Sequence, residues 1–287
     1  MCRVLEVSKS GYYDWRKEER TPRDEWDDRL KDLIKVLHAK SFGGYGARRI
    51  VTGLKQQGII VNIKKIRRLM RKIGIKGKST PKKRIITTDS NHDNPVAKNL
   101  VDRKFTVDAP NKVWVTDITY IWTEQGWVYL AIVIDLFSRM VVGWSVDSSI
   151  NIKLISRALE IAFNKRKPLP GLLLHSDRGS QYTSNDYRLL AHKFGMTLSM
   201  SRKANCWDNA VAESFFRTIK TELIKNTKIN SLKHAYELIF NYIENFYNSC
   251  RLHSYLLYKS PLNFESEVIL NPDLLLKRQN FLKKSVR

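Results

Sequence analysis

The sequence has 287 residues, 43% of them hydrophobic, and its 51 Lys and Arg against 28 Asp and Glu give a formal net charge of +23. This composition argues against a chain that is disordered throughout. The excess of positive charge favours a polyanionic partner over a basic protein without one, because such a partner relieves the repulsion between like charges. Nucleic acid is the first candidate and an acidic membrane surface the second. We expect no transmembrane helix, because no apolar run reaches about 18 residues, and a reduced cytoplasmic setting, because the N-terminus lacks a signal-peptide pattern and the three cysteines are far apart without a CxxC motif.

Residues 1–75 are predicted to form a small helical domain. Apolar residues at helical spacing mark a first helix near 26–37, glycines in SFGGYG end it, and a second short helix is expected at 47–57. A third helix begins after Asn62, a suitable N-cap, and ends at Gly74. Its outer face would carry six cations with no acidic residue between them: Lys64, Lys65, Arg67, Arg68, Arg71 and Lys72. Three short helices with a basic last one suit a helix-turn-helix-like DNA-binding domain; an ordinary solvated basic helix is the alternative.

Residues 76–110 are predicted to be a basic linker. They begin with KGKSTPKKR and continue through TTDSNHDNPVAKN, which has no hydrophobic periodicity. Segments of this composition are flexible or extended. The basic opening either follows a phosphate backbone or is solvated without contacts.

Residues 111–265 have the pattern of an α/β domain, and a C-terminal tail is expected at 266–287. Three strands come first, KVWVTDITYIWT, WVYLAIVIDLF and MVVGWSV, and their short connections predict an antiparallel meander. A helix near 152–163, a strand LLLHSD, a helix at 185–194, a strand TLSMS and a long helix at 208–223 follow. This order predicts a mixed five-stranded sheet with flanking helices. A further helix at 232–248 is expected to pack onto the core rather than to offer a stacking surface to nucleic acid.

Three acidic residues stand in unusual positions: Asp117 within a predicted strand, Asp177 at the end of another, and Glu213 in the long helix. A carboxylate in a buried strand is costly unless it is paired, hydrogen-bonded or bound to metal, and ligand sites of α/β sheets gather at strand ends. If the strands of Asp117 and Asp177 lie side by side, their carboxylates repel each other and a divalent cation resolves the repulsion. Each residue taken alone has a structural alternative as a hydrogen-bond acceptor. We interpret Asp135, at the end of another apolar strand, in that way, with assistance to the site as its alternative role.

The set of motifs is more specific than its members. WVTDITY, LHSDRGSQYTS, DNAVAESFFRTIKTE, YNSCRLHS and SPLNF, with YGARRI near the N-terminus, resemble the integrase-core (DDE) transposases of bacterial insertion sequences. The match is to the second-reading-frame protein of the insertion-sequence-three family, related to retroviral integrases, and it covers nearly the whole chain. Between Asp177 and Glu213 lie 35 residues, a spacing typical of that family, and Lys220 follows Glu213 by about two helical turns, where the family has Lys or Arg. One departure is Leu257, which stands where the family usually has Gly.

The resemblance implies a ribonuclease-H-like catalytic core at 111–265, in which Asp117, Asp177 and Glu213 are the catalytic residues and the metal ligands. It implies Mg²⁺, with Mn²⁺ as a substitute, and two ions per active site when DNA is bound. The expected reaction cleaves the ends of an insertion sequence and joins the freed 3′-hydroxyl to another phosphodiester. The expected partners are double-stranded DNA at element ends and target, at least one further copy of the chain, and an upstream-frame DNA-binding protein or fusion, since the chain has no heptad zipper at its start. We expect it in the bacterial cytoplasm, associated with the nucleoid and not with a membrane.

Several further residues are candidates for DNA contact: Lys220, Arg178, Gln181, Asn209, Arg251 and His253. The alternative for Lys220 is an exposed helix lysine, and the alternative for Arg178 and Gln181 is that they are solvated loop residues. For Asn209 it is a helix cap, and for Arg251 and His253 a turn that faces another subunit. Asn209 and Ser214 flank Glu213 and either orient it or cap its helix. His175 is interpreted as a core histidine, and Trp207 as a packing residue rather than a base-stacking one.

Two other functions fit parts of this pattern. One is a different nuclease of the same fold, such as a ribonuclease H or a junction resolvase; the other is a non-catalytic DNA-binding regulator. The basic N-terminal domain and Lys220 favour joining of specific DNA ends over the first. The intact set of three carboxylates argues against the second.

Overall fold

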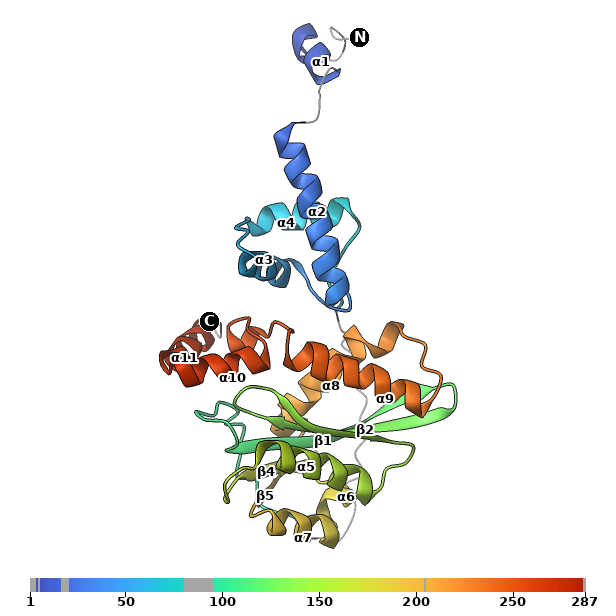
Figure 1. Ribbon diagram of the computed structural model, residues 1–287, viewed down its shortest axis with the longest axis vertical. Coiled ribbons are helices and arrows are strands. Elements are labelled where there is room, and N and C mark those ends of the chain that lie inside the picture. Colours follow the sequence, from blue (N-terminus) through green and yellow to red (C-terminus); the bar gives the residue numbers. More distant parts are fainter. Residues whose placement is uncertain (1–3, 5, 17–20, 80–94, 204, 286–287) are drawn as a thin grey trace. The chain divides into compact units, whose positions relative to one another are not determined.

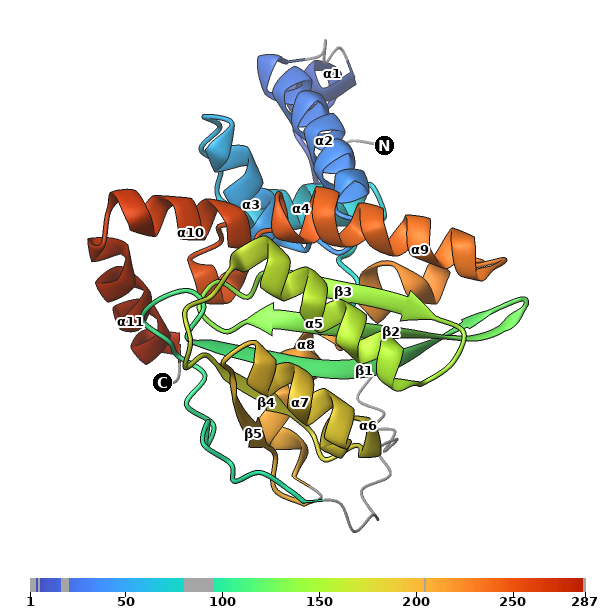
Figure 2. The same cartoon turned by 60° about the horizontal axis from the view of Figure 1, so that its bottom comes forward.

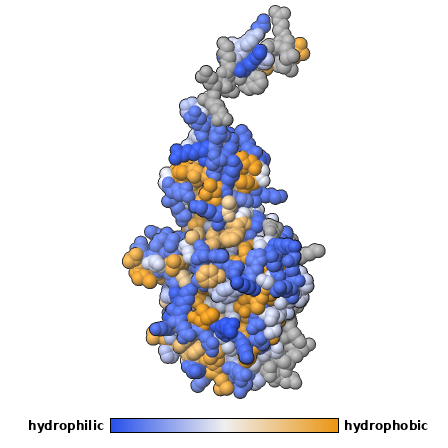
Figure 3. All heavy atoms as spheres, turned by 45° about the vertical axis from the view of Figure 1, so that its right-hand side comes forward, coloured by the Kyte–Doolittle hydropathy of each residue, from blue (hydrophilic) through white to orange (hydrophobic). Residues whose placement is uncertain are grey.

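The computed structural model of the protein describes residues 4, 6–16, 21–79, 95–203 and 205–285. The chain divides into two compact units, Met1–Lys78 and Ser79–Arg287 (Figure 1). Of the linker predicted at 76–110, residues 80–94 lie outside the described residues. Figure 3 shows one face of the molecule, on which hydrophilic residues predominate and apolar residues form separate patches. Among the described residues, no helix has the length and apolar character needed to cross a membrane.

The N-terminal unit is all-α. It contains α1 (Lys9–Arg16), α2 (Pro22–Lys40), α3 (Ala47–Gln56) and α4 (Ile63–Lys72). The sequence patterns predicted the last three, whereas α1 was not expected. The backbone N–H of Lys64 donates to the Asn62 side chain at 2.8 Å, which confirms the predicted N-cap of α4. The apolar stripes of the three helices meet in a fully buried core: Leu30, Ile34, Ile50, Leu54, Ile66 and Leu69.

The C-terminal unit is built on a mixed five-stranded sheet (Figures 1 and 2). The strands are β1 (Val113–Thr123), β2 (Gly126–Asp135), β3 (Val141–Asp147), β4 (Leu173–Ser176) and β5 (Thr197–Met200), in the order β3-β2-β1-β4-β5. The pairs β1–β2 and β2–β3 are antiparallel, whereas β1–β4 and β4–β5 are parallel. The predicted meander and mixed sheet are therefore confirmed, and the condition that the strands of Asp117 and Asp177 lie side by side is met.

Helices cover both faces of this sheet. Figure 1 shows α5 (Ile152–Arg166), α6 (Ser180–Thr183) and α7 (Asn185–Lys193) on one face and α8 (Ala210–Glu222) and α9 (Leu232–Phe240) on the other. The first face holds the large apolar core around Trp114, and α5 approaches β3 closely at Gly143. An added Cβ there would lie 2.2 Å from the Ala158 carbonyl oxygen, so the contact requires glycine.

The chain after α8 packs onto the sheet through helical turns. The helix predicted at 232–248 is formed by α9 and the π-helical η3 (Asn241–Asn248), and its apolar face is buried as expected. Three short 3₁₀ turns, η1 (Cys206–Asn209), η2 (Ile224–Asn226) and η4 (Ser254–Leu256), complete the connections. Leu257, which stands where the resembling family usually has Gly, adopts the left-handed conformation that glycine favours, with φ 57°.

The segment expected to be a tail is folded. It begins within α10 (Pro261–Leu270) and contains α11 (Asp273–Ser285). Arg278 is fully buried, and its guanidinium donates to the carbonyl oxygens of Phe137 at 2.9 Å and Val107 at 2.8 Å. The same group lies 5.1 to 5.4 Å from the ring centroids of Phe137, Tyr255 and Phe264. Together with Leu274, which packs in the same apolar cluster as Phe137, this side chain fixes the last helix to the turn after β2.

Candidate active site

Two of the predicted carboxylates lie at one end of the sheet. The parallel pairing of β1 with β4 joins Val113 to Leu173 and Val115 to His175. The same register carried two residues further brings Asp117 level with Asp177. The β1–β4 pairing therefore places both carboxylates where the shorter strand ends, which is the position that ligand sites of α/β sheets occupy.

The electrostatics of Asp117 reflect this crowding. Burial raises the pKa of the Asp117 carboxyl well above its usual value, the charge of Asp177 raises it further, and Glu213 adds a smaller contribution in the same direction. The backbone N–H of Ile118 donates to the Asp117 Oδ1 at 2.8 Å and Lys220 lies nearby, and both lower the pKa. The net result is a carboxyl group whose negative charge is costly to hold without a cation.

Asp177 is held by the loop that follows β4. Its Oδ1 accepts a hydrogen bond from the backbone N–H of Gly179 at 2.9 Å, and Gly179 is the N-cap of α6. A Cβ at Gly179 would approach the Asp177 Oδ1 to 3.2 Å and the Gln181 Oε1 to 3.0 Å, so the loop is tight. Because the loop is closed in this way, the Asp177 carboxylate has a defined position beside β1.

Glu213 lies in the first turn of α8 and is exposed to solvent. The start of this helix is attached to β1, because Asn209 is buried and its Nδ2 donates to the Thr116 carbonyl oxygen at 3.3 Å. This contact is one residue from Asp117. Asn209 is therefore placed where it orients the helix of Glu213 relative to the strand of Asp117.

A buried acid that the sequence analysis missed secures the same region. Asp208 has no solvent exposure and accepts hydrogen bonds from Arg202, Arg103 and Asn99 at 2.8 to 3.0 Å. The Arg202 hydrogen bonds hold the pKa of Asp208 well below its usual value. Its only sequence signal was its place directly before Asn209, since Arg103 and Asn99 lie about a hundred residues earlier. The acid ties the loop before α8 to the segment that leads into the sheet.

The donor set can be compared with what a metal ion requires. Across the described residues, no three His, Cys, Asp or Glu side chains lie close enough together to hold a metal ion. Asp117 and Asp177 nevertheless provide paired carboxylates with unfavourable mutual repulsion, and Glu213 is the third acid that acts on Asp117. Oxygen-only donors of this kind suit a hard divalent cation. The residues thus fit such an ion in chemistry, with Glu213 required to turn inward to complete the set.

Lys220 reaches the same place from α8. It is half-buried, and its Nζ lies over the ring of Tyr120, 4.3 Å from the centroid. Burial lowers the pKa of Lys220, while the charge of Asp117 raises it. A desolvated ammonium group beside the carboxylates is a suitable contact for a DNA phosphate, and it differs from the exposed helix lysine of the alternative interpretation.

The structure places the other predicted DNA contacts in different settings. Arg178 donates through Nε to the Ser201 carbonyl oxygen at 2.6 Å, and Gln181 is half-exposed in α6. The prediction that Arg251 contacts DNA is wrong. Arg251 is buried and forms a two-point ion pair with Glu222, so its guanidinium faces the protein interior. His253 is half-buried in the turn that follows.

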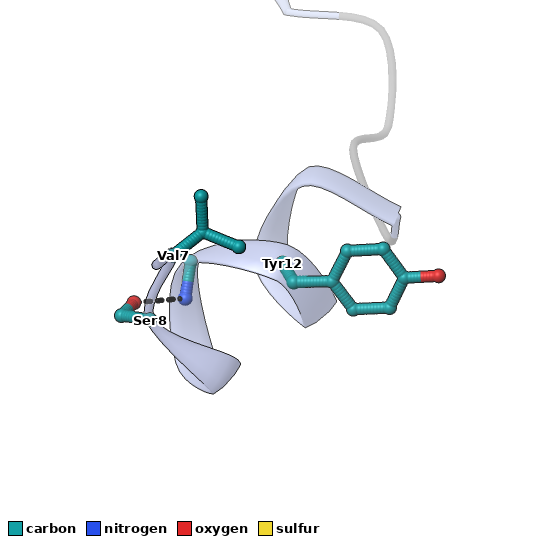
Figure 4. A pocket seen from close by; sticks show the side chains of 4 residues that line it. Val7, Ser8 and Tyr12 are labelled. Atoms are coloured by element: carbon teal, nitrogen blue, oxygen red, sulfur yellow. Dashed lines mark hydrogen bonds between the residues drawn. The ribbon is translucent and has the colours of Figure 1, made fainter. Parts of the chain in front are cut away.

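The cations of α4 lie mostly on the surface of the N-terminal unit. Two of them contact Asp27 of α2, Lys65 at 2.6 Å and Arg68 at 2.9 Å. The other four are exposed: Lys64, Arg67, Arg71 and Lys72. A hollow of about 270 Å³ beside α1 in the same unit is lined by Val7, Ser8, Gly11 and Tyr12. Figure 4 shows Val7, Ser8 and Tyr12 around it. Its lining contains no carboxylate, so it offers no ligands for a metal ion.

Three further interpretations can be compared with the structure. His175 is confirmed as a core histidine: it is fully buried between the hydroxyl groups of Ser199 at 2.8 Å and Ser201 at 3.2 Å. Asp135 is confirmed as structural, because it is fully buried and accepts the backbone N–H groups of Asn111 and Phe137. Trp207 was expected to pack, and this is wrong: 65% of it is exposed.

Comparison with known proteins agrees with this geometry. A model of the integrase core domain matches residues 107–206, a second integrase core domain model matches residues 194–261, and a model of the HTH-like domain matches residues 25–84. The catalytic core of HTLV-2 integrase in complex with magnesium (trimeric form) is similar, with 16% identity, a TM-score of 0.43, and coverage of 55% of this chain and 97% of that chain. The family models confirm the expected integrase core and helix-turn-helix-like domain, and the five-stranded sheet confirms the expected α/β class.

Two relatives match over nearly the whole length. The insertion element IS600 uncharacterized 31 kDa protein of Shigella sonnei is 43% identical over 267 residues, which is 93% of this chain and 98% of that protein. Transposase InsF for insertion sequence IS3A of Escherichia coli (strain K12) is 37% identical over 269 residues, which is 93% of each. The chain therefore belongs to the integrase-core transposases of the IS3 family of insertion sequences.

Proposed function

We propose that this transposase cleaves the ends of an insertion sequence and joins the freed 3′-hydroxyl to a second phosphodiester at a site formed by Asp117, Asp177 and Glu213. The observation that carries the proposal is the parallel pairing of β1 with β4, after which Asp177 directly follows and acts electrostatically on Asp117, with α8 bringing Glu213 to the same region. The reaction exchanges one phosphodiester for another, so it needs no covalent enzyme intermediate. No serine or tyrosine nucleophile is assigned.

The three carboxylates are proposed to hold divalent metal, Mg²⁺ or Mn²⁺ in its place, as two ions per site when DNA is bound. When bound, the ions supply positive charge that activates the attacking oxygen and stabilises the leaving oxygen. The protein's own contribution is the fixed spacing of Asp117 and Asp177, which their strands and the Gly179 contact determine. Glu213, on a helix surface, completes the set by a side-chain rotation, so DNA and metal binding are coupled in this proposal.

Positive groups are proposed to position the DNA. Lys220 holds a phosphate near the reacting bond, because its ammonium group is half-buried beside Asp117. The exposed cations of α4 bind the duplex in a helix-turn-helix-like manner. Joining two ends requires at least two copies of the chain, and an upstream-frame DNA-binding protein or fusion remains part of the proposal. A DNA substrate places the protein at the nucleoid, in the bacterial cytoplasm.

The proposal is tested with a plasmid that carries the gene, its upstream frame and its native flanking DNA. PCR across the expected junction detects excised circles or joined ends. We expect junctions with the wild type and none with Asp117→Asn. The matched control is Asp186→Asn, which removes an exposed carboxylate from α7 of the same unit and should leave the junctions unchanged.

The same experiment addresses the other two functions. A non-catalytic regulator would give no junctions with either protein, although the purified chain would bind the element ends without divalent metal. A nuclease without joining activity would give cut ends that depend on Asp117 and no joined products. Junctions that persist in Asp117→Asn would contradict the assignment of the site.

A further inference from the structure

An exposed aromatic surface lies at the far end of the β1–β2 hairpin. It consists of Tyr120, Trp122 and Trp127, named here the hairpin aromatic surface. Trp122 is 59% exposed and Trp127 is 47% exposed. Their ring centroids are 4.9 Å apart, and the Tyr120 ring lies 5.1 Å from that of Trp127. Large apolar side chains held together in solvent in this way mark an interaction surface.

The position of the three rings follows from the strand register. Tyr120 and Trp122 are two residues apart on β1, so both point to the same face of the sheet, and Trp127 is the cross-strand partner of Trp122. The pairing of β3 with β2 ends at Tyr129, and the pairing of β4 with β1 ends at Val115. Among the described strands, the hairpin therefore continues as a two-stranded ribbon, which extends past β3 in Figures 1 and 2.

The hairpin is fixed, although it protrudes. The Thr123 hydroxyl donates to the Gly126 carbonyl oxygen at 2.8 Å, which closes the turn. The backbone N–H of Glu124 donates to the Ile229 carbonyl oxygen at 2.9 Å, and its carboxylate pairs with Lys228 at 2.6 Å. These contacts attach the tip of the hairpin to the chain that follows α8. The rings therefore have little conformational freedom to lose when a partner binds.

Lys220 links the hairpin aromatic surface to the proposed active site. Lys220 lies over the Tyr120 ring at one end of the surface and interacts with Asp117. Trp122 is five residues further along β1 than Asp117, which corresponds to about 17 Å at the rise of a strand. That length matches about five nucleotides of a DNA strand at 3.4 Å each. The separation of five residues is odd, so the side chains of Asp117 and Trp122 point to opposite faces of β1. Among the described strands, β1 has no partner on its β4 side beyond Val115, so a DNA strand that leaves the reacting phosphate would pass around this edge, beside Lys220, to reach the two tryptophans.

We propose that the hairpin aromatic surface stacks unpaired bases of the DNA strand next to the reacting phosphate. The inference rests on the proposed function, because that function brings DNA to Asp117. The formal net charge of +23 and the ammonium group at one end of the row favour a polyanion over an uncharged protein partner. Inside a duplex the faces of the bases are covered by their neighbours, so rings five nucleotides from the end can stack only on bases that have separated from their partners. Every base has an aromatic face, so this contact is tolerant of sequence.

The test measures the binding of single-stranded DNA directly. The full-length chain is titrated, in buffer with EDTA, onto a fluorescein-labelled 20-nucleotide single strand and onto a duplex of the same sequence, and anisotropy gives each Kd. Trp122→Ala and Trp127→Ala should each raise the single-strand Kd at least about fivefold, as expected for loss of one stacked base. The duplex Kd should change less than twofold, because the N-terminal unit retains its cations. Trp122→Tyr, which keeps a ring, should recover most of the single-strand affinity.

The matched control is Phe240→Ala. Phe240 is also an exposed aromatic residue of the C-terminal unit, and its ring stacks on that of Tyr236 in α9. Its removal should leave both Kd values unchanged. Single-strand affinity that is the same in Trp122→Ala, Trp127→Ala and the wild type would overturn the proposal, as would a wild type that does not bind the single strand. A change of oligomeric state in the tryptophan variants without a change in DNA binding would assign the surface to a second copy of the chain and overturn it as well.

The outcome is separable from that of the proposed function. Asp117→Asn should leave the single-strand Kd in EDTA unchanged while it abolishes junction formation. If Asp117→Asn still formed junctions, the active-site assignment would fail while the stacking result stood on its own measurement.

Discussion

Replacement of Arg251 by Met should destabilise the C-terminal unit strongly. Arg251 and Glu222 are 4% and 5% exposed, and two hydrogen bonds of 2.9 and 2.6 Å join the guanidinium to the carboxylate. The Tyr242 hydroxyl donates to the same carboxylate at 2.7 Å. Without Arg251 the Glu222 carboxylate stays buried and loses the positive charge of this guanidinium, which costs about 3–5 kcal/mol of unfolding free energy. For a unit of this size that corresponds to a lower Tm by about 10 °C.

The measurement is urea unfolding followed by tryptophan fluorescence, with the double variant Arg251→Met/Glu222→Gln as the fourth corner of a mutant cycle. Because the double variant leaves no buried charge, it should be more stable than Arg251→Met alone. Tyr242→Phe removes one hydrogen bond and should cost about 1 kcal/mol. A loss below 1 kcal/mol in Arg251→Met, together with weaker DNA binding, would refute the reasoning and restore the DNA contact expected from the sequence.

Three further outcomes are expected. Leu257→Gly should be more stable than Leu257→Ala by about 1 kcal/mol in urea unfolding, because both lose the side chain and only glycine adopts φ 57° without strain. A higher stability of Leu257→Ala would show that the backbone at this position is not strained. Burial lowers the pKa of His175 from 6.5 to about 4, so stability is full above pH 6.5 and is lost as the pH falls towards 4. Between pH 6.5 and 5, over 1.5 pH units, the unfolding free energy should fall by about 2 kcal/mol in the wild type and not in His175→Gln. Equal pH profiles of stability for the two proteins would contradict the lowered pKa of His175. In thermal unfolding without metal, the Tm of Asp117→Asn should be higher than that of the wild type, because repulsion from Asp177 is relieved. Addition of MgCl₂ should raise the wild-type Tm and not that of the variant. An equal rise of the variant's Tm would exclude Asp117 as a ligand.

The strands and the carboxylates were predictable because their signals are local. Apolar and β-branched runs identified β1, β2 and β3, and the costly position of an acid in such a run identified Asp117. The sequence did not predict that β1 and β4 are neighbours, and this pairing was only assumed. Two strands that pair across a long intervening segment leave no local pattern in the sequence. The sheet order supplies this condition and brings Asp117 level with Asp177.

The misjudged residues depend on partners that are distant in the sequence. Arg251 was expected to lie in a turn that faces DNA or another subunit, and its burial depends on Glu222, a residue 29 positions earlier. Trp207 was expected to pack because it is large and apolar, but its neighbour Asp208 takes the interior position with its arginine partners. Periodicity and composition do not encode such pairs, so a charged residue can be buried and an aromatic one exposed against expectation.

The anchoring of α11 by Arg278 has a consequence for how the protein is made. A ribosome releases the chain from its N-terminus, and Arg278 follows Asp117, Asp177 and Glu213 in the sequence, so it is synthesised after all three carboxylates. The space that its guanidinium fills, between the Phe137 and Val107 carbonyl groups, therefore stays open while the strands of the sheet are already made. A chain that is cut short before Arg278 carries all three carboxylates and still lacks the group that closes the turn after β2. Such a fragment should be degraded by cellular proteases faster than a chain that contains Arg278.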